Sequence, residues 1–468
     1  MSRVLRSLYG PVTRPGLTTR CRELNPEQGA AVPVTATDGP LSFDAPRWTG
    51  RRALAETVVV NGLLTGLGAV AGVLAARLLG PQGRGALALG LAVAGITTVI
   101  VGLGLQQAFA YLVAARRDTA GMAVSLAVWS GASIGGLSVG LAWLLVLAFV
   151  NDETVSAVVR IGLLGIPGTV IAMNTAGILQ GLRLGRRFNT SRLLHPTAYC
   201  VGIVGVVLIV DRVTPEELAS VYAVAAAIGA AGAYCLLPTS VRRLRLPSRR
   251  FTSSALRYGA TAGVGGAALA ASTHLAVPFL GALAGLRETG FYAVGLSYAI
   301  PVTLIASAIG IHTLPDIAAA DIQVRGDLVR RRLTVTFGTL LPIAAAAVLA
   351  APLLVPAVFG AEFRPAVAPA QILVLAQSFR AVAYVLADVW RGLGRPGVPS
   401  LAETAGILAT IALFPLVVPK FGGQGAAIVV ATATGGVTLL MALGIRRALR
   451  YLPSPRSHHR ITAKDVES

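Results

Sequence analysis

The sequence is poor in charged residues, in lysine and in cysteine. Only 13% of its 468 residues are charged and 54% are hydrophobic, which excludes an ordinary water-soluble globular protein of this length. The three cysteines, Cys21, Cys200 and Cys235, are odd in number and lack metal-ligand spacing, so we expect no disulfide framework. We also expect no metal site and no cofactor. The Gly-x-x-x-x-Gly-Lys run of nucleotide-hydrolysing proteins is missing, which argues against ATP hydrolysis by that route.

Apolar stretches make up most of the chain. Each is close to the roughly 20 residues that a helix needs to cross a bilayer. We mark off twelve of them: Val58–Leu79, Gly85–Leu105, Ala123–Phe149, Ile161–Leu182, Leu193–Val210, Leu218–Leu237, Gly259–Leu283, Gly290–Leu314, Thr334–Phe359, Val367–Trp390, Leu401–Val418 and Gly425–Ile445.

Cationic residues gather in every second gap between these stretches. The rich gaps hold clusters such as Arg116–Arg117 and Arg330–Arg332, whereas the poor gaps hold single cations such as Arg212 and Lys420. The positive-inside rule then places the rich gaps and both termini in the cytoplasm, and twelve spans keep the alternation unbroken. Membrane topology and anionic lipid headgroups explain the net charge of +20, so membrane lipids are expected partners and nucleic acid is not.

The longest internal polar stretch, Thr239–Ser254, divides the membrane part into two bundles of six helices. Gly85–Leu91, at the start of the second span, aligns with Gly290–Leu296, at the start of the eighth, which indicates a parallel repeat about an axis along the membrane normal. No hydrophobic core of signal-peptide type precedes Thr57, so we expect no cleavage there. The predicted organisation is a disordered cytoplasmic arm at 1–55, a first six-helix lobe at 56–238, a cytoplasmic linker at 239–255, a second six-helix lobe at 256–447 and a cytoplasmic tail at 448–468.

Short motifs occur in a fixed order on this frame, among them Ala76–Gly85, Gly104–Tyr111, Gly177–Leu182, Val358–Phe363, Gly392–Pro396 and Phe421–Ala427. With these motifs, residues 56 to 445 resemble the polysaccharide-type flippases of the multidrug/oligosaccharidyl-lipid/polysaccharide exporter superfamily. The resemblance implies an all-α polytopic membrane protein with twelve transmembrane helices in two six-helix lobes around a central cavity. It also implies export of lipid-linked sugars without ATP.

One position departs from the family pattern. Many relatives carry an Arg-x-Asp sequence in the seventh span, whereas the aligned residues here are His274-Leu275-Ala276. A cation-coupling or substrate role for that acidic residue is therefore not carried over.

Polar and charged side chains within spans are costly in lipid, so they are the candidates for substrate binding in the cavity. Gln377, Arg380, Tyr384 and Asp388 fall within an arc of roughly 80° on the tenth span. Arg380 is the candidate ligand of a pyrophosphate oxygen, with Asp388 placed to hold Arg380 or a neighbouring helix. The alternative is a structural polar seam between helices. The other candidates, each with a packing or capping role as its alternative, are Glu56, Asn61, Gln106, Asn174 and His274.

These observations favour a flippase or exporter that moves lipid-linked oligosaccharide or polysaccharide precursors across the bacterial plasma membrane by alternating access. The expected partners are the lipid-linked glycan and glycan-assembly enzymes, and we expect no enzymatic activity. Two alternatives stay open. A cation-coupled multidrug antiporter of the same superfamily needs a buried acidic site, which the seventh span lacks. A membrane-bound glycan polymerase or glycosyltransferase needs a sizeable loop, and the exterior gaps are short.

Overall fold

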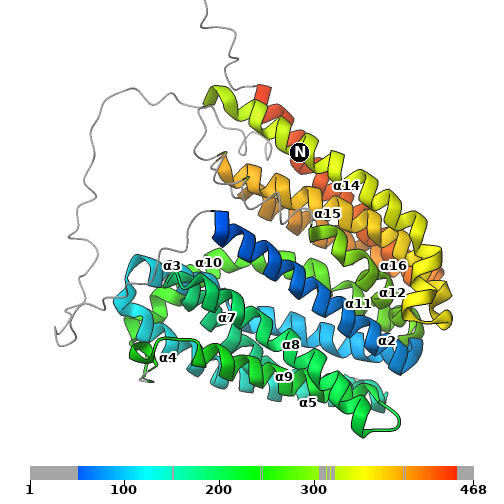
Figure 1. The fold of residues 1–468 in the computed structure, drawn as a ribbon, viewed down its shortest axis with the longest axis horizontal. Coiled ribbons are helices and arrows are strands. Elements are labelled where there is room, and N and C mark those ends of the chain that lie inside the picture. The colour runs from blue at the N-terminus through cyan, green and yellow to red at the C-terminus, as the bar shows by residue number, and fades with distance from the viewer. Residues whose placement is uncertain are drawn as a thin grey trace, which may run out of the picture. The chain divides into compact units, whose positions relative to one another are not determined.

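The computed structural model describes residues 51–450 except 150–151, 243, 245, 305–312, 314–316, 318–321, 394 and 396 (Figure 1). The predicted terminal arm and tail fall almost wholly outside this part of the chain. The described residues form helices and turns, without a strand. The α-helices are α2 (Arg51–Gly102), α3 (Leu105–Ala115), α4 (Ala120–Ser130), α5 (Gly136–Phe149), α6 (Glu153–Leu163), α7 (Ile166–Gly181), α8 (Gly185–Ile209), α9 (Pro215–Cys235), α10 (Arg249–His274), α11 (Ala276–Ala284), α12 (Leu286–Ala299), α14 (Ile322–Phe359), α15 (Val367–Gly392) and α16 (Gly397–Arg450).

Eight helical segments of the described chain are long and apolar enough to cross a membrane. Two of them are too long for one crossing: α2 has 52 residues, which is about 78 Å of straight helix against a hydrocarbon core of about 30 Å. Each long segment is interrupted by a glycine with left-handed φ, Gly80 in α2 (64°) and Gly422 in α16 (53°). Glycine adopts this conformation without the steric cost of a Cβ atom, so α2 and α16 are each two helices joined at a glycine. The chain is an all-α, multi-span membrane protein.

The turns of the cation-poor gaps meet at one end of the described bundle. Gly80 lies beside the carboxylate of Glu362, and Gly83 lies beside Pro215. The Glu288 carboxylate accepts a hydrogen bond of 2.8 Å from the N–H of Gly423. These turns come from five different gaps of the sequence, as the alternation of charge predicts. We call this the cation-poor end.

Turns of three cation-rich gaps contact one another at the other end of the helices of the first half. Arg187 donates to the carbonyl oxygen of Leu236 at 3.1 Å and so caps the last turn of α9. Val241, after α9, packs into the same apolar cluster as Val113, near the end of α3. We call this the cation-rich end.

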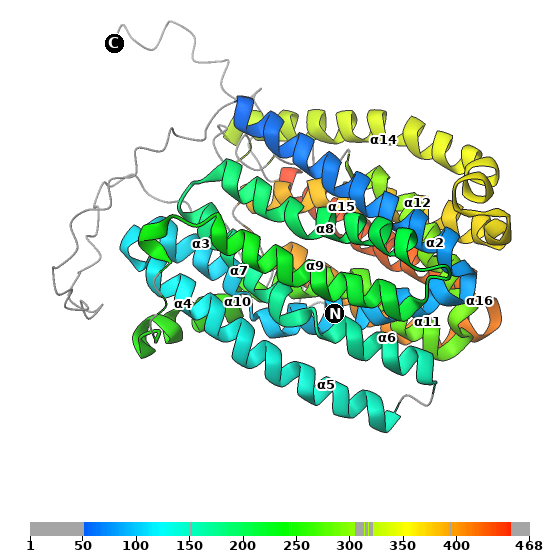
Figure 2. The ribbon, with the colours of Figure 1, turned by 60° about the horizontal axis from the view of Figure 1, so that its bottom comes forward.

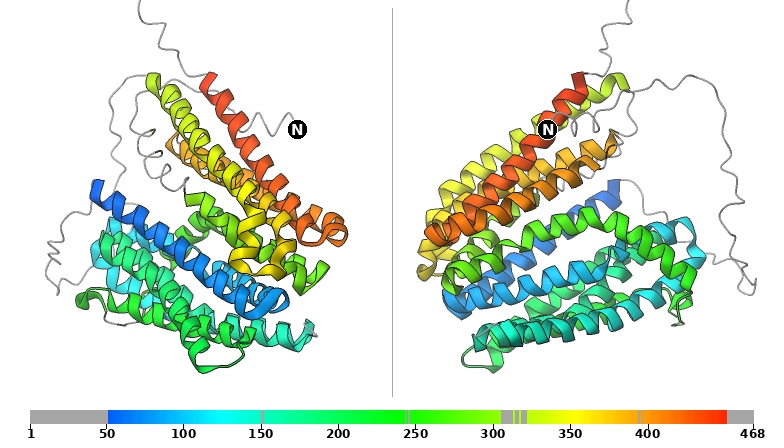
Figure 3. Two further views of the ribbon diagram at one scale, coloured as in Figure 1. Left: turned by 45° about the vertical axis from the view of Figure 1, so that its right-hand side comes forward. Right: turned by 180° about the vertical axis from the view of Figure 1, so that it is seen from behind.

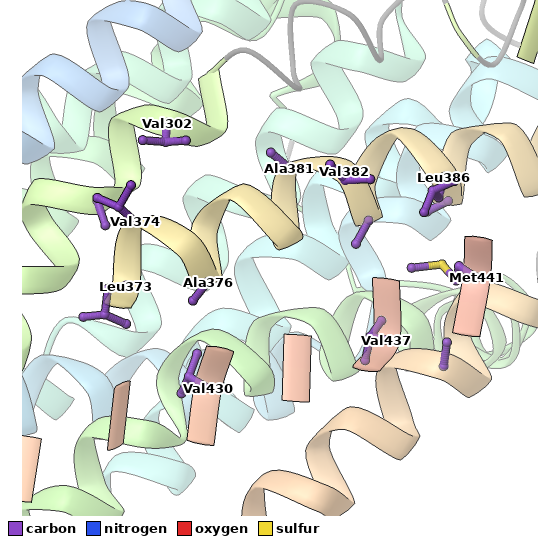
Figure 4. Packing of buried hydrophobic residues seen from close by; sticks show 14 of the residues in the cluster. Val302, Leu373, Val374, Ala376, Ala381, Val382, Leu386, Val430, Val437 and Met441 are labelled. Carbon is purple, nitrogen blue, oxygen red and sulfur yellow. The ribbon is translucent and has the colours of Figure 1, made fainter. Parts of the chain in front are cut away.

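Buried apolar side chains form the largest core cluster between α15 and α16, with contributions from α11, α12 and α14. Trp390 of α15 is fully buried there, and its indole N–H donates to the carbonyl oxygen of Met441 at 3.3 Å. Figure 4 shows part of this packing, with Val302 from the turn after α12 and with side chains of α15 and α16: Leu373, Val374, Ala376, Ala381, Val382, Leu386, Val430, Val437 and Met441. The enclosure of α15 places its polar residues inside the bundle.

Large apolar side chains are also exposed on the outside, especially on α5, α8 and α14. Leu208 and Ile209 are 81% and 85% exposed, and Leu349 and Leu353 are 80% and 73% exposed. Apolar surface of this extent is unfavourable in water and suits contact with lipid chains.

Helices α2 to α9 make up the first half of the described chain, and α10 to α16 the second. Figures 2 and 3 show α14, α15 and α16 grouped together, and α8 and α9 side by side. Helix α10 belongs to the second half of the chain but packs against helices of the first half. Phe251 and Ala255 lie in the core cluster of α3, α4 and α7. The ring of Tyr258 stacks on that of Tyr111 of α3, with 4.5 Å between the ring centroids. After a break at Leu275, α11 packs against α16 and α12.

Candidate functional site

The four polar residues predicted on the tenth span all lie on α15. Gln377 and Arg380 are 6% and 7% exposed, and Tyr384 and Asp388 are half-buried. Helix α15 contacts α12, α14 and α16, so this stripe lies among the helices of the second half. A buried guanidinium needs compensation for the lost hydration of its charge.

A residue that the sequence did not single out places an opposite charge near Arg380. Glu403 of α16 lies near enough to Arg380 for the guanidinium to attract its carboxylate. The carboxylate of Asp388 instead pairs with Arg391 of its own helix, at 3.0 Å. An anionic ligand at Arg380 therefore has to compete with Glu403. The sequence feature that could have pointed to Glu403 is its position near the start of the predicted span Leu401–Val418.

The two candidates on the first span are held by arginines of α8 near the cation-rich end. The Glu56 carboxylate accepts from Arg186 at 3.2 Å, and the Asn61 side-chain oxygen accepts from Arg192 at 2.9 Å. The Arg192 guanidinium also lies over the ring of Phe188, 5.4 Å from its centroid. Because the Arg186 side chain is 83% exposed, its ion pair contributes about 0–1 kcal/mol and can exchange for another anion.

The remaining three candidates lie on separate helices. Asn174 of α7 is 1% exposed, and its side-chain nitrogen lacks a hydrogen-bond partner among the described residues. Gln106 of α3 is half-buried, and its backbone lies against Gly177. His274, at the end of α10, is half-buried with its imidazole beside Gly95 of α2. The structure thus divides the candidates among the α15 stripe, the α2–α8 contacts and these three positions.

Arg84 lies in a cation-poor gap of the sequence and was not among the predicted site residues. In the structure it is half-buried, and its guanidinium donates to the Ser297 hydroxyl of α12 at 3.4 Å. Its Nε atom is buried and has no hydrogen-bond partner within the part of the chain that the structure describes. Arg84 is therefore a cation between the two halves with unused donor capacity. Within the same residues, no cluster of His, Cys, Asp or Glu is suited to hold a metal ion.

Known proteins resemble the chain in both sequence and fold. A family model described as "Polysaccharide biosynthesis protein" matches residues 54–318, more than half of the chain. No curated protein sequence matches it. Among solved structures, the lipid II flippase MurJ in an inward closed conformation has a TM-score of 0.67 at 13% identity, over 84% of this chain and 87% of that one. An inward-facing multidrug resistance MATE family transporter of the MOP superfamily has a TM-score of 0.65 at 15% identity, over 84% of this chain and 98% of that one.

Proposed function

Because the chain belongs to the polysaccharide biosynthesis protein family, whose members are membrane transporters and not enzymes, we propose that it flips lipid-linked oligosaccharide or polysaccharide precursors across the bacterial plasma membrane. The family match over residues 54–318 is the observation that carries this proposal. The shared fold with a lipid flippase supports it. The enzyme alternative is set aside by the family.

The physical problem of such a substrate is its head group. Charged phosphates and sugar hydroxyls cannot cross hydrocarbon without partners for their lost hydration. Arg186 and Arg192 near the cation-rich end, and Arg84 between the halves, offer charge-assisted hydrogen bonds to phosphate. The substrate head enters at the cation-rich end, which faces the cytoplasm in this proposal, and leaves at the cation-poor end by alternating access.

The finer organisation is part of the same proposal. Twelve spans form two six-helix lobes, at 56–238 and 256–447, around a cavity, with both termini in the cytoplasm. The predicted cavity residues, with Arg84 added, contact the head group while the lipid tail stays in the bilayer. Charge alternation and the meeting of the cation-poor turns at one end support this arrangement.

The test is transport in the native membrane. In a strain lacking the protein, labelled glycan lipid should become inaccessible to a periplasmic probe, and the intact chain should restore access. An Arg84→Gln variant should restore less access than Arg212→Gln, which changes a cation-poor loop residue. Access that is unchanged on deletion would refute the proposal.

A second candidate is a cation-coupled multidrug antiporter, which the fold shared with MATE transporters favours. Expression in a drug-sensitive host distinguishes the two. We expect unchanged drug susceptibility, and resistance that depends on an ion gradient would establish the antiporter instead.

A further inference from the structure

Two hairpins of the cation-poor end repeat one another in detail. The first turns at Gly80 (φ 64°, ψ −177°) and the second at Gly285 (φ 85°, ψ 176°), so the two glycines share one unusual backbone conformation. One residue later come Pro81 and Leu286, and five residues after each turn come Gly85 and Gly290. The sequence alignment of Gly85 with Gly290 is therefore matched by local backbone structure.

The repeated hairpins pack against each other reciprocally. A Cβ atom on Gly85 would lie 1.8 Å from the carbonyl oxygen of Leu286, and a Cβ atom on Gly290 would lie 1.9 Å from that of Pro81. Each glycine thus faces the carbonyl four residues before the other glycine. Contact this close leaves no room for any side chain larger than hydrogen. We call these four residues the glycine seam.

Polar contacts surround the glycine seam and also join α2 to the second half. Arg77 donates to the carbonyl oxygens of Ala357 and Val358, both at 2.7 Å, and so caps the end of α14 from another helix. The Arg84–Ser297 hydrogen bond lies along the same contact between α2 and α12. The cation-poor end is therefore closed by a backbone contact with hydrogen bonds around it.

We propose that the glycine seam is the closing contact of this end in the transport cycle, formed when the end is shut and parted when it opens. The inference rests on the proposed function only in requiring a transport cycle, because opening can be measured without knowing the substrate. A side chain at either glycine prevents closure and shifts the population towards the state open at the cation-poor end.

The first experiment adds a methyl group to the seam. Gly85→Ala and Gly290→Ala are compared with Gly66→Ala, where a Cβ atom meets nothing within 4 Å. Each carries Ser297→Cys as reporter in a chain without native cysteines, and a membrane-impermeant maleimide is added to intact cells. We expect labelling on the order of tenfold faster in the two seam variants and unchanged in Gly66→Ala. Parental labelling in well-folded seam variants would overturn the proposal.

The second experiment leaves both seam glycines unchanged. It therefore tests the proposal even if Gly85→Ala and Gly290→Ala fail to fold. A Cβ atom on Gly72 of α2 would lie 3.3 Å from the Cβ of Ser297, close to the separation of about 3.5–4.5 Å in disulfides. The pair Gly72→Cys with Ser297→Cys should cross-link under mild oxidation and stop transport until a reductant is added. Either single variant should be insensitive to oxidant.

The outcomes separate this inference from the proposed function. If the cross-linked protein transports at the parental rate, the seam does not part and the inference is wrong, although glycan transport stands. If labelling responds to Gly85→Ala while deletion leaves glycan access unchanged, the seam is confirmed and the substrate assignment fails.

Discussion

Substitutions that change the charge around Arg380 provide the most direct test of the role of the polar residues on α15. Replacing Glu403 by Gln leaves the guanidinium, 7% exposed, without the carboxylate that interacts with it. Removing one partner of a fully buried ion pair costs about 3–5 kcal/mol, and removing one from an exposed pair costs about 1 kcal/mol or less. Because Glu403 is half-buried and attracts Arg380 through space, we expect Glu403→Gln to lower the free energy of unfolding by about 1 kcal/mol, measured on purified protein in lipid nanodiscs.

A double-mutant cycle isolates the pair. Arg380→Met, Glu403→Gln and the double variant should show a coupling energy of about 1 kcal/mol, because the double variant removes both charges of the interaction. Asp388→Asn is the matched control on the same helix: its partner Arg391 is half exposed, so we expect a loss below about 0.5 kcal/mol. An additive cycle, or a control as costly as Glu403→Gln, refutes the assignment of Glu403 as the counter-charge.

Transport rates in the same variants distinguish a substrate-binding role of Arg380 from a purely structural role. If Arg380 holds an anionic head group, Arg380→Met abolishes transport while Glu403→Gln retains it, since the cation remains and its competitor is gone. If the pair is only structural, transport in both variants follows their stability, and Arg380→Lys restores both properties in part.

Three further predictions concern the ends of the molecule. Arg77→Gln should lower the free energy of unfolding by about 1–2 kcal/mol, since two hydrogen bonds from a charged donor are lost at an exposed site; calorimetry of the purified protein measures this. Gly422→Ala should lower the free energy of unfolding by about 1–2 kcal/mol or more, because the φ of Gly422 is 53° and a Cβ atom there would lie 2.6 Å from a carboxylate oxygen. The control Gly436→Ala places its Cβ atom in open space and should leave stability unchanged. Equal melting temperatures for the two variants would contradict this prediction. A cysteine replacing Gln82 should react with an impermeant maleimide in intact cells, and one replacing Arg183 only after permeabilisation; the reverse pattern would invert the proposed orientation.

The sequence predicted the helical class, the grouping of the turns and the Gly85–Gly290 correspondence. Each of these depends on a pattern local to the chain: apolar length, charge in alternate gaps, or glycine spacing. The placement of the α15 residues on one face likewise follows from helical periodicity. These features need no knowledge of which helices are neighbours.

The partners of the charged residues could not be predicted. Arg77 reaches carbonyls of Ala357 and Val358, and a backbone acceptor has no residue type that marks it in the sequence. Arg84 and Ser297 are more than two hundred residues apart, so their contact follows only from the packing of α2 on α12. The attachment of α10 to α3 through Tyr258 and Tyr111 is hidden for the same reason.

The carbonyl groups opposite Gly85 and Gly290 restrict which second mutations can compensate for a substitution at either glycine. When two side chains collide, a smaller residue at one position can make room for a larger one at the other. Leu286 and Pro81 contribute their peptide oxygens at these contacts, and every amino acid carries the same oxygen. A selection for revertants of Gly85→Ala should therefore yield the original glycine or changes that displace a whole helix, and not a resized neighbour.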